Sequence, residues 1–289
     1  MDKKKSSFKN TNGYKALKKL FRRHTALVGL IIVVFFINVA VVGLFWTPYD
    51  SSVTNSKLMF ATSSLAHPFG CDDMGRDIFS RAMEGASVSI MVGILSIAFA
   101  MFIGTMLGMI SGYYRGTVGV IIDKLVEAIW AFPSLILAMM LTVILGSGIQ
   151  NVIIALSVVF IPNFARITRS MTLSVRENEY IQSAVSIGLS DFHIMTRYIL
   201  PNISSALIVQ ASLSAASAII QESTLSFLGL GVQLPASSWG SILKTGYTYI
   251  WKAPLMSVYP GLCIALMVLG LNFLGDGLRD ALDVRTKDF

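Results

Sequence analysis

Six long apolar segments constrain the fold of this 289-residue chain more than any other feature of its sequence. Each has the roughly 17–25 residues that a helix needs to cross a bilayer. Hydrophobic residues make up 54% of the chain and charged residues only 13%, against about 25% charged in soluble domains. The pattern predicts an all-α polytopic membrane protein with spans at Thr25–Trp46, Ser87–Ile110, Ile121–Leu145, Asn151–Ile167, Asn202–Glu222 and Leu255–Leu274.

The basic residues give these spans a direction, because loops on the cytoplasmic side carry an excess of Lys and Arg. With both termini in the cytoplasm, all but five of the 23 basic residues lie inside; the exceptions are Lys57, Arg76, Arg81, Lys244 and Lys252. The predicted parts are then a basic cytoplasmic tail (1–24), the first span (25–46), an outer segment (47–86), a five-helix core (87–275) and a cytoplasmic tail (276–289). The tail's charge indicates a partner in the anionic lipid leaflet and no nucleic acid.

Within the core, residues 166–201 form a cytoplasmic loop and residues 223–252 an extracytoplasmic one. The cytoplasmic stretch Glu179–Pro201 has apolar residues at helical spacing, followed by Gly188, which suits the left-handed backbone that ends a helix. Ser190 can cap a second short helix, and Pro201 is expected to stop it. A compact helical hairpin on the inner face of a membrane protein indicates a docking site.

This stretch resembles the EAA loop of permease subunits of ATP-binding cassette (ABC) importers, in the spacing of Ala184, Gly188 and the Tyr-Ile-Leu-Pro run ending at Pro201. Two departures are that Gln182-Ser183-Ala184 replaces Glu-Ala-Ala and that Tyr198 replaces the usual Ile. In that family the loop docks into a separate ATPase subunit. The resemblance implies a coupling role for Glu179, Tyr180, Gln182, Ser183, Ala184, Gly188, Asp191, Arg197, Leu200 and Pro201.

Further motifs follow in the family's order, and the resemblance spans about Thr25 to Asp280. The stretch from His67-Pro68 to Ser80-Arg81, the pieces at 226–232 and 238–240, and the terminus at 275–280 resemble the second (C-type) permease subunit of the peptide and nickel subfamily. Cys71 stands where Thr is more usual. The resemblance implies the six-span fold of type I ABC importer permeases in a prokaryotic cell membrane. It also implies a second homologous permease subunit, two ATPase subunits and an extracytoplasmic solute-binding protein as partners.

The resemblance implies dipeptides or oligopeptides as substrates, with nickel or another metal chelate as the alternative. No cofactor is expected. His67, Asp72 and Asp73 fit no known metal-ligand spacing, and Arg76 and Asp77 are able to pair locally. Cys71 and Cys263 also fit no metal spacing, and no disulfide between them is expected.

Small residues in two spans leave alternatives open. Gly104, Gly108 and Gly112 lie four apart, which favours close packing inside the helix bundle over dimerisation. The fifth span is rich in small polar residues, which either line a pathway or pack against a partner. Its candidate pathway residues are Gln210, Ser214, Ser217, Gln221 and Glu222.

Two other function classes fit the sequence less well. A secondary transporter usually places ionisable residues in mid-membrane and often shows an internal repeat, but these spans are almost free of charge at their centres. A membrane-embedded enzyme would need a catalytic arrangement, and none is evident. The chain also has no Walker lysine motif, so ATP would be hydrolysed by another subunit.

Overall fold

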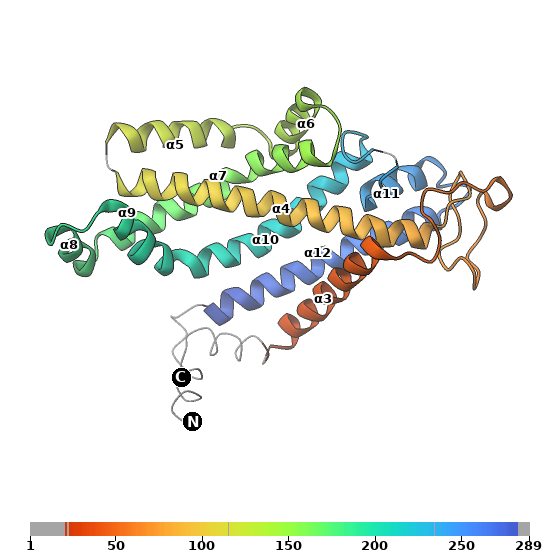
Figure 1. Ribbon diagram of the computed structural model, residues 1–289, viewed down its shortest axis with the longest axis horizontal. Coiled ribbons are helices and arrows are strands. Elements are labelled where there is room, and N and C mark those ends of the chain that lie inside the picture. Colours follow the sequence, from red (N-terminus) through yellow and green to blue (C-terminus); the bar gives the residue numbers. More distant parts are fainter. Residues whose placement is uncertain (1–20, 22, 115, 234, 283–289) are drawn as a thin grey trace.

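A computed structural model describes residues 21, 23–114, 116–233 and 235–282, which excludes most of the two predicted tails. The described residues form helices and loops, with one isolated β-bridge. Five long helices run lengthwise through the molecule (Figure 1): α3 (His24–Phe45), α4 (Ile78–Tyr113), α7 (Ile149–Arg176), α10 (Leu200–Phe227) and α12 (Leu255–Leu282). Each lies in a helical stretch long and apolar enough to cross a membrane.

The third predicted span, Ile121–Leu145, is two helices rather than one continuous helix. Helices α5 (Thr117–Trp130) and α6 (Ser134–Leu145) meet at 92°. Pro133 lies at the break, where its missing N–H and fixed φ prevent the first helix from continuing. Counted as one span, the pair brings the candidate spans to as many as six, the predicted number.

The helix does not stop at Pro201, which corrects a second expectation. Helix α9 (Asp191–Ile194), a π-helical turn labelled η2 (Met195–Ile199) and α10 form one stretch of 37 residues. Proline is tolerated in the first turn of a helix, where its missing N–H breaks no hydrogen bond. The π-helical turn directly before α10 changes the hydrogen-bonding pattern, so the helix continues past Pro201. Most of the other spans also extend beyond their predicted limits, because hydropathy marks only the membrane-immersed part of a helix; α3, at 22 residues, does not.

The glycines of α4 face α7, which answers the question left open by their spacing. A Cβ added at Gly104 would lie 2.6 Å from the Ile161 carbonyl oxygen, and one at Gly108 would lie 2.4 Å from that of Ala165. Atoms cannot approach so closely, so these two helices meet backbone to backbone. The glycine stripe therefore packs the bundle of a single chain.

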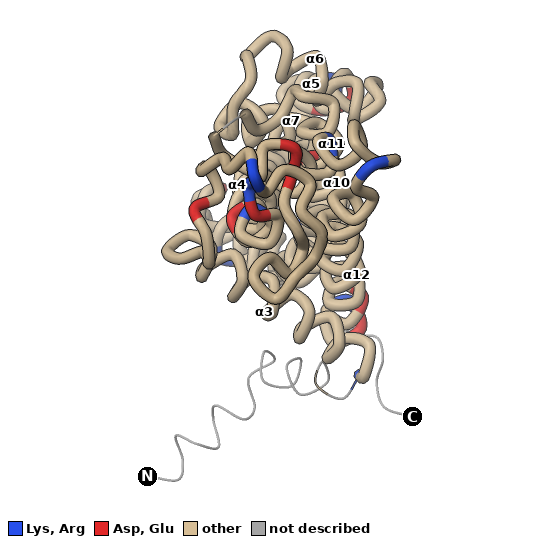
Figure 2. The backbone as a smooth tube through the Cα atoms, turned by 90° about the vertical axis from the view of Figure 1, so that its right-hand side faces the viewer, with Lys and Arg blue, Asp and Glu red and all other residues tan. Residues whose placement is uncertain are grey.

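The outer segment is held by buried charges at one end of α4. Asp72 accepts hydrogen bonds from Arg76 Nε and Arg81 Nη1, both at 2.7 Å, and Asp77 bonds His67. The expected pairing of Arg76 with Asp77 is therefore wrong. Figure 2 shows acidic and basic positions close together at this end. Burial, helped by the carboxylates of Asp77 and Asp72, raises the pKa of the Cys71 thiol to about 11, so the free thiol stays protonated at neutral pH.

A short helix covers the end of the bundle that is predicted to lie outside the cell. Helix α11 (Trp239–Thr248) lies within the predicted loop 223–252 and begins with a capping box between Ser238 and Ser241. The fully buried Trp239 donates a hydrogen bond from Nε1 to the carbonyl of Ala82 on α4, at 3.0 Å. The outer loops are therefore attached to α4, the helix that also packs on α7.

Substitution at Gly108 tests the packing of α4 on α7. We expect Gly108→Ala to lower the melting temperature of the purified permease, because overpacking costs about 1–3 kcal/mol. Gly261→Ala is the matched control, since the nearest atom to its added Cβ is 4.0 Å away. The measurement is thermal unfolding in detergent. A Gly108→Ala protein as stable as the control would contradict the close approach.

Candidate functional site

The cytoplasmic stretch folds as the predicted helical hairpin, formed by α8 (Glu179–Ser186) and α9. Gly188 has a φ of +81°, and its N–H donates to Val185 O at 3.0 Å while the next N–H donates to Ala184 O. This pair of bonds is the Schellman motif that ends helices at a left-handed residue. Ser190 then caps α9 by accepting from His193 N. Local sequence alone therefore predicted this geometry correctly.

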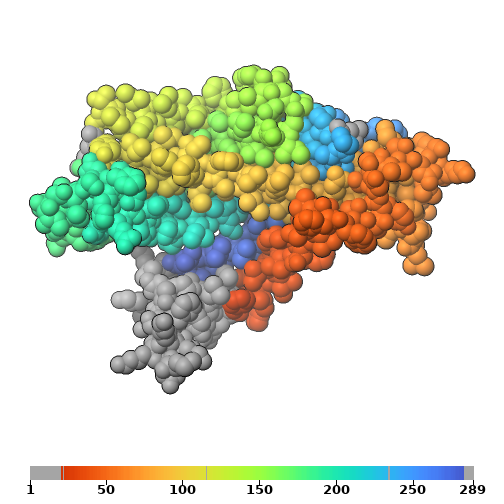
Figure 3. All heavy atoms as spheres, in the orientation of Figure 1, coloured from red at the N-terminus to blue at the C-terminus, as the bar shows by residue number. Residues whose placement is uncertain are grey.

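The hairpin exposes an apolar surface that the helical period did not predict. Ile181 and Ala184 are buried against the bundle. Tyr180 and Ile187, which the helical spacing places with them, point to solvent. We call the exposed set the docking patch; its members are 46–76% exposed and comprise Tyr180, Val185, Ile187 and Phe192. The hairpin projects at the left end of Figure 3. Large apolar side chains gathered on an exposed loop are typical of surfaces that contact another protein or a membrane.

Most residues predicted for the coupling loop are exposed on or beside this hairpin. Ala184 is buried and Leu200 is half-buried, while the exposed ones are Glu179, Tyr180, Gln182, Ser183, Gly188, Asp191, Arg197 and Pro201. Gln182 donates from Nε2 to the Glu177 carbonyl at 3.3 Å, so it braces the start of α8. Three members of the docking patch, Val185, Ile187 and Phe192, were missing from the predicted set. The sequence did hold a signal for them, because this stretch has more apolar residues than one buried helix face can hold.

The hairpin is anchored to two long helices through Asp191, the first residue of α9. Tyr113, at the last position of α4, donates its hydroxyl to Asp191 Oδ1 at 2.8 Å. Arg176, at the end of α7, lies over the Tyr113 ring at 5.4 Å. Tyr114 also interacts with the Asp191 carboxylate. Movement of the hairpin would therefore pull on both α4 and α7.

Three adjoining cavities, of about 660, 540 and 340 Å³, form a second candidate site. All three are lined by Trp130, and we call them together the polar groove. The largest lies between α5 and α7 beside Asp123, Glu127, Arg166 and Arg169. The other two are lined by α5, α7 and α10, with α6 also lining the smallest of the three.

The chemistry of the groove changes along its length. One end is charged: Arg169 pairs with Asp123 at 2.7 Å, and Arg166 lies over the Trp130 ring at 4.8 Å. The other two cavities offer amides, hydroxyls and an aromatic ring, supplied by Asn163, Gln210, Ser217, Gln221 and Phe132. Such a surface suits a polar solute that carries charges of both signs.

The predicted pathway residues divide into two groups. Gln210, Ser217 and Gln221 line the groove. Ser214 and Glu222 are buried inside the subunit, so in this conformation they depart from the expectation. Glu222 accepts hydrogen bonds from Ser226 at 2.8 Å and Ser223 at 3.3 Å. Passage of a solute through the groove stays a prediction.

Comparison with protein families decides what kind of protein this is. Residues 104–288 match the family described as the binding-protein-dependent transport system inner membrane component. The chain belongs to this family. Residues 12–68 match the N-terminal transmembrane domain of oligopeptide transport permease C. The chain is therefore a multi-pass membrane permease subunit of the C type, as its motifs predicted.

Several curated relatives are similar over nearly the whole permease. The dipeptide transport system permease protein DppC of Alkalihalophilus pseudofirmus is 41% identical over 94% of this chain and 90% of its own. The glutathione transport system permease proteins GsiD of Pectobacterium atrosepticum and Escherichia coli O157:H7 are 40% and 41% identical, each over 93% of this chain and 90% and 89% of theirs.

A solved structure supports the fold independently. The permease superposes with a TM-score of 0.56 on a chain from inward-facing conformations of the MetNI methionine ABC transporter. The two are 20% identical, and the match covers 68% of this chain and 94% of that one. The type I importer permease fold expected from the sequence is confirmed.

The turn between α8 and α9 gives a direct test of the hairpin. We expect Gly188→Val to increase amide exchange across Glu179–Ile194, because a β-branched residue at positive φ costs at least ~1–2 kcal/mol. No atom lies within 4 Å of the added Cβ, so backbone strain alone is tested. Gly188→Asn is the control, since Asn tolerates the left-handed region. Equal exchange in the two variants would show that the turn does not need glycine.

Proposed function

We propose that this permease forms half of a translocation pathway for short peptides in an ATP-driven importer, with ATP hydrolysed by separate subunits. The observation that carries the proposal is the pairing of an exposed apolar docking patch with a polar groove on one chain. The named functions of the relatives, dipeptide and glutathione transport, supply the substrate class. Nickel or another metal chelate is the alternative.

The partners follow from surfaces that this chain leaves incomplete. An ATPase subunit would cover the docking patch, because large exposed side chains such as Ile187 and Phe192 favour burial. A second, homologous permease subunit would complete the wall of the groove and bind a second ATPase in the same way. An extracytoplasmic solute-binding protein would deliver substrate to the outer loops around α11. The lipid bilayer covers the apolar faces of the remaining helices.

Coupling would run from the hairpin to the groove. ATP binding would draw the two ATPases together and move the docked hairpins. The contacts of Asp191 with Tyr113, and of Tyr113 with Arg176, would pass this movement to α4 and α7. Because α7 carries Asn163 and Arg166, its displacement would reshape the groove. Nucleotide shifts the equilibrium by its different affinity for the two states.

The groove offers partners for each part of a short peptide. Arg166 can receive the terminal carboxylate, since it lines the groove over the Trp130 ring and forms no salt bridge among the described residues. Gln221 Oε1 is buried without a hydrogen-bond partner in the part of the chain that the structure describes, so it can accept a peptide N–H. A second peptide N–H or carbonyl can bond the Asn163 amide. The groove therefore favours the peptide over the metal chelate.

Substitution in the docking patch tests the proposal. We expect Phe192→Ser to lower co-purification of the ATPase with tagged permease at least tenfold, which corresponds to about 1.4 kcal/mol of lost binding. Uptake of labelled dipeptide should fall with it, while membrane insertion stays normal. Ser186→Ala is the control, because Ser186 is exposed on α8 and belongs neither to the docking patch nor to the predicted coupling residues.

The substrate class is tested by uptake into cells that carry the same variants. Cells that express the wild-type importer are supplied with labelled dipeptide, glutathione or a nickel chelate. We expect uptake of labelled dipeptide or glutathione, and we expect Phe192→Ser to lower it. Uptake of the nickel chelate alone would contradict the peptide assignment. Normal ATPase retention by Phe192→Ser would contradict the role of the docking patch.

A further inference from the structure

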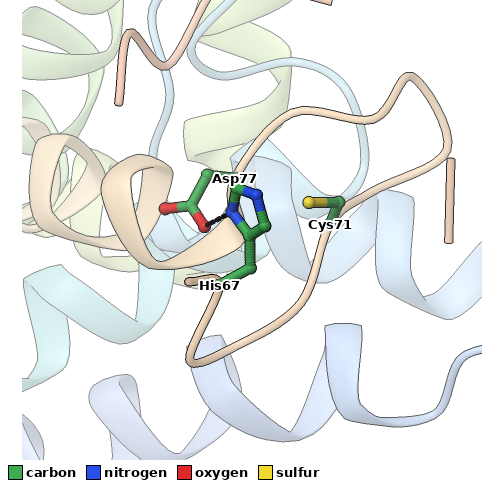
Figure 4. A group of neighbouring side chains, drawn as sticks. All are labelled: His67, Cys71 and Asp77. Atoms are coloured by element: carbon green, nitrogen blue, oxygen red, sulfur yellow. Dashed lines mark hydrogen bonds and ion pairs between the residues drawn. The ribbon is translucent and has the colours of Figure 1, made fainter. Parts of the chain in front are cut away.

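We propose that His67, Cys71 and Asp77 form a binding site for a zinc ion in the outer segment, at the extracytoplasmic end of α4. A ring nitrogen, a thiol sulfur and a carboxylate oxygen from these three residues lie within 4.8 Å of one another. Figure 4 shows the sulfur of Cys71 pointing toward the imidazole ring, with Asp77 on the ring's other side. Cys71 is 1% exposed and Asp77 is 3% exposed, so the cluster is enclosed.

The distances are close to those of a zinc site. Zinc is held at about 2.3 Å from sulfur and about 2.0–2.2 Å from nitrogen and oxygen. In a tetrahedral arrangement these bonds place the ligand atoms about 3.3–3.8 Å apart. The nitrogen and oxygen of His67 and Asp77 are already 2.9 Å apart. His67 Nδ1 and Asp77 Oδ1 would separate by about 0.4 Å or more, and the more distant ligand atoms would close by about 1 Å, which side-chain rotation can supply.

The backbone holds the three ligands in place before any ion binds. Cys71 and Asp77 face each other in a β-bridge, and Ile78 N donates to Gly70 O at 3.1 Å. Asp77 Oδ2 accepts from the Ser80 N–H and hydroxyl, both at 2.7 Å, which leaves Oδ1 directed at His67. The Tyr49 ring lies 4.5 Å from the imidazole and limits its rotation. Little conformational entropy would therefore be lost on binding.

Charge also favours a cation at this position. The two nearby arginines are paired with Asp72, and no Lys or Arg pairs with Asp77 in the described part of the chain. A divalent ion bound by the Cys71 thiolate, the Asp77 carboxylate and a neutral His67 gives a site of zero net charge. Binding transfers one proton, from the Cys71 sulfur, to solvent.

The ligand set selects the metal. Thiolate and imidazole are ligands that zinc prefers, whereas magnesium and calcium take oxygen ligands. Three protein ligands leave one tetrahedral position, which water would occupy. The site would fasten the loop that carries Cys71 to the start of α4. It involves neither the docking patch nor the polar groove, so it stands independently of the proposed function.

Cobalt replacement tests the site in the assembled importer. The complex is stripped with a chelator and titrated with Co²⁺, then with competing Zn²⁺. We expect one Co²⁺ per permease with a thiolate-to-cobalt charge-transfer band, and a band that is lost in Cys71→Thr. Zn²⁺ affinity at this site should fall at least tenfold in Cys71→Thr and in His67→Gln.

Two controls separate the site from other metal-binding groups of the complex. Cys263→Ser removes the other free cysteine, and Asp73→Asn removes a neighbouring carboxylate outside the cluster. Both should bind as the wild type does, and Cys71→Thr should keep normal peptide uptake, which shows that it folds. A wild-type spectrum without the thiolate band, or identical binding by Cys71→Thr, would contradict the zinc site. The three residues would then only hold the loop to α4 through hydrogen bonds.

Discussion

The close approach of α4 and α7 is the constraint on which the other features depend. Glycine at positions 104 and 108 lets the two backbones touch, so the helices act as one rigid unit. With 36 residues, α4 is about 54 Å long and joins the outer segment to the cytoplasmic hairpin. Because α7 carries one wall of the polar groove, this unit connects the docking patch to the proposed path of the solute.

Each end of the unit is fixed by polar contacts. On the outer side, Asp72 pairs with both Arg76 and Arg81 in a buried cluster whose loss would strand two charges. On the inner side, Asp191 is held by the hydroxyl of Tyr113. Between these ends, α4 and α7 meet mainly through apolar and small side chains. Such a bundle can pivot without breaking charged contacts in the membrane, as the proposed coupling requires.

Features set by local sequence could be predicted, and those set by distant contacts could not. Hydropathy placed the spans, and the left-handed Gly188 and the Ser190 cap follow from backbone preferences of single residues. The docking patch was only partly predicted, because helical spacing does not show which face of α8 the bundle buries. The Tyr113–Asp191 contact joins residues 78 apart, and no local pattern indicates it. Proline likewise broke one helix at Pro133 but not another at Pro201, since tertiary context decides between these outcomes.

Our main proposal is that movement of the hairpin changes the shape of the groove through the hairpin's anchor on α4. Its most direct test replaces Tyr113 and Tyr114 with Phe, which removes the hydroxyls near Asp191 and keeps the Tyr113 ring under Arg176. ATPase retention, ATP hydrolysis and peptide uptake are measured together in reconstituted importer, with Tyr247→Phe in α11 as the control. We expect the ATPase to stay bound and active while uptake per ATP falls several-fold. Unchanged uptake per ATP would contradict this proposal.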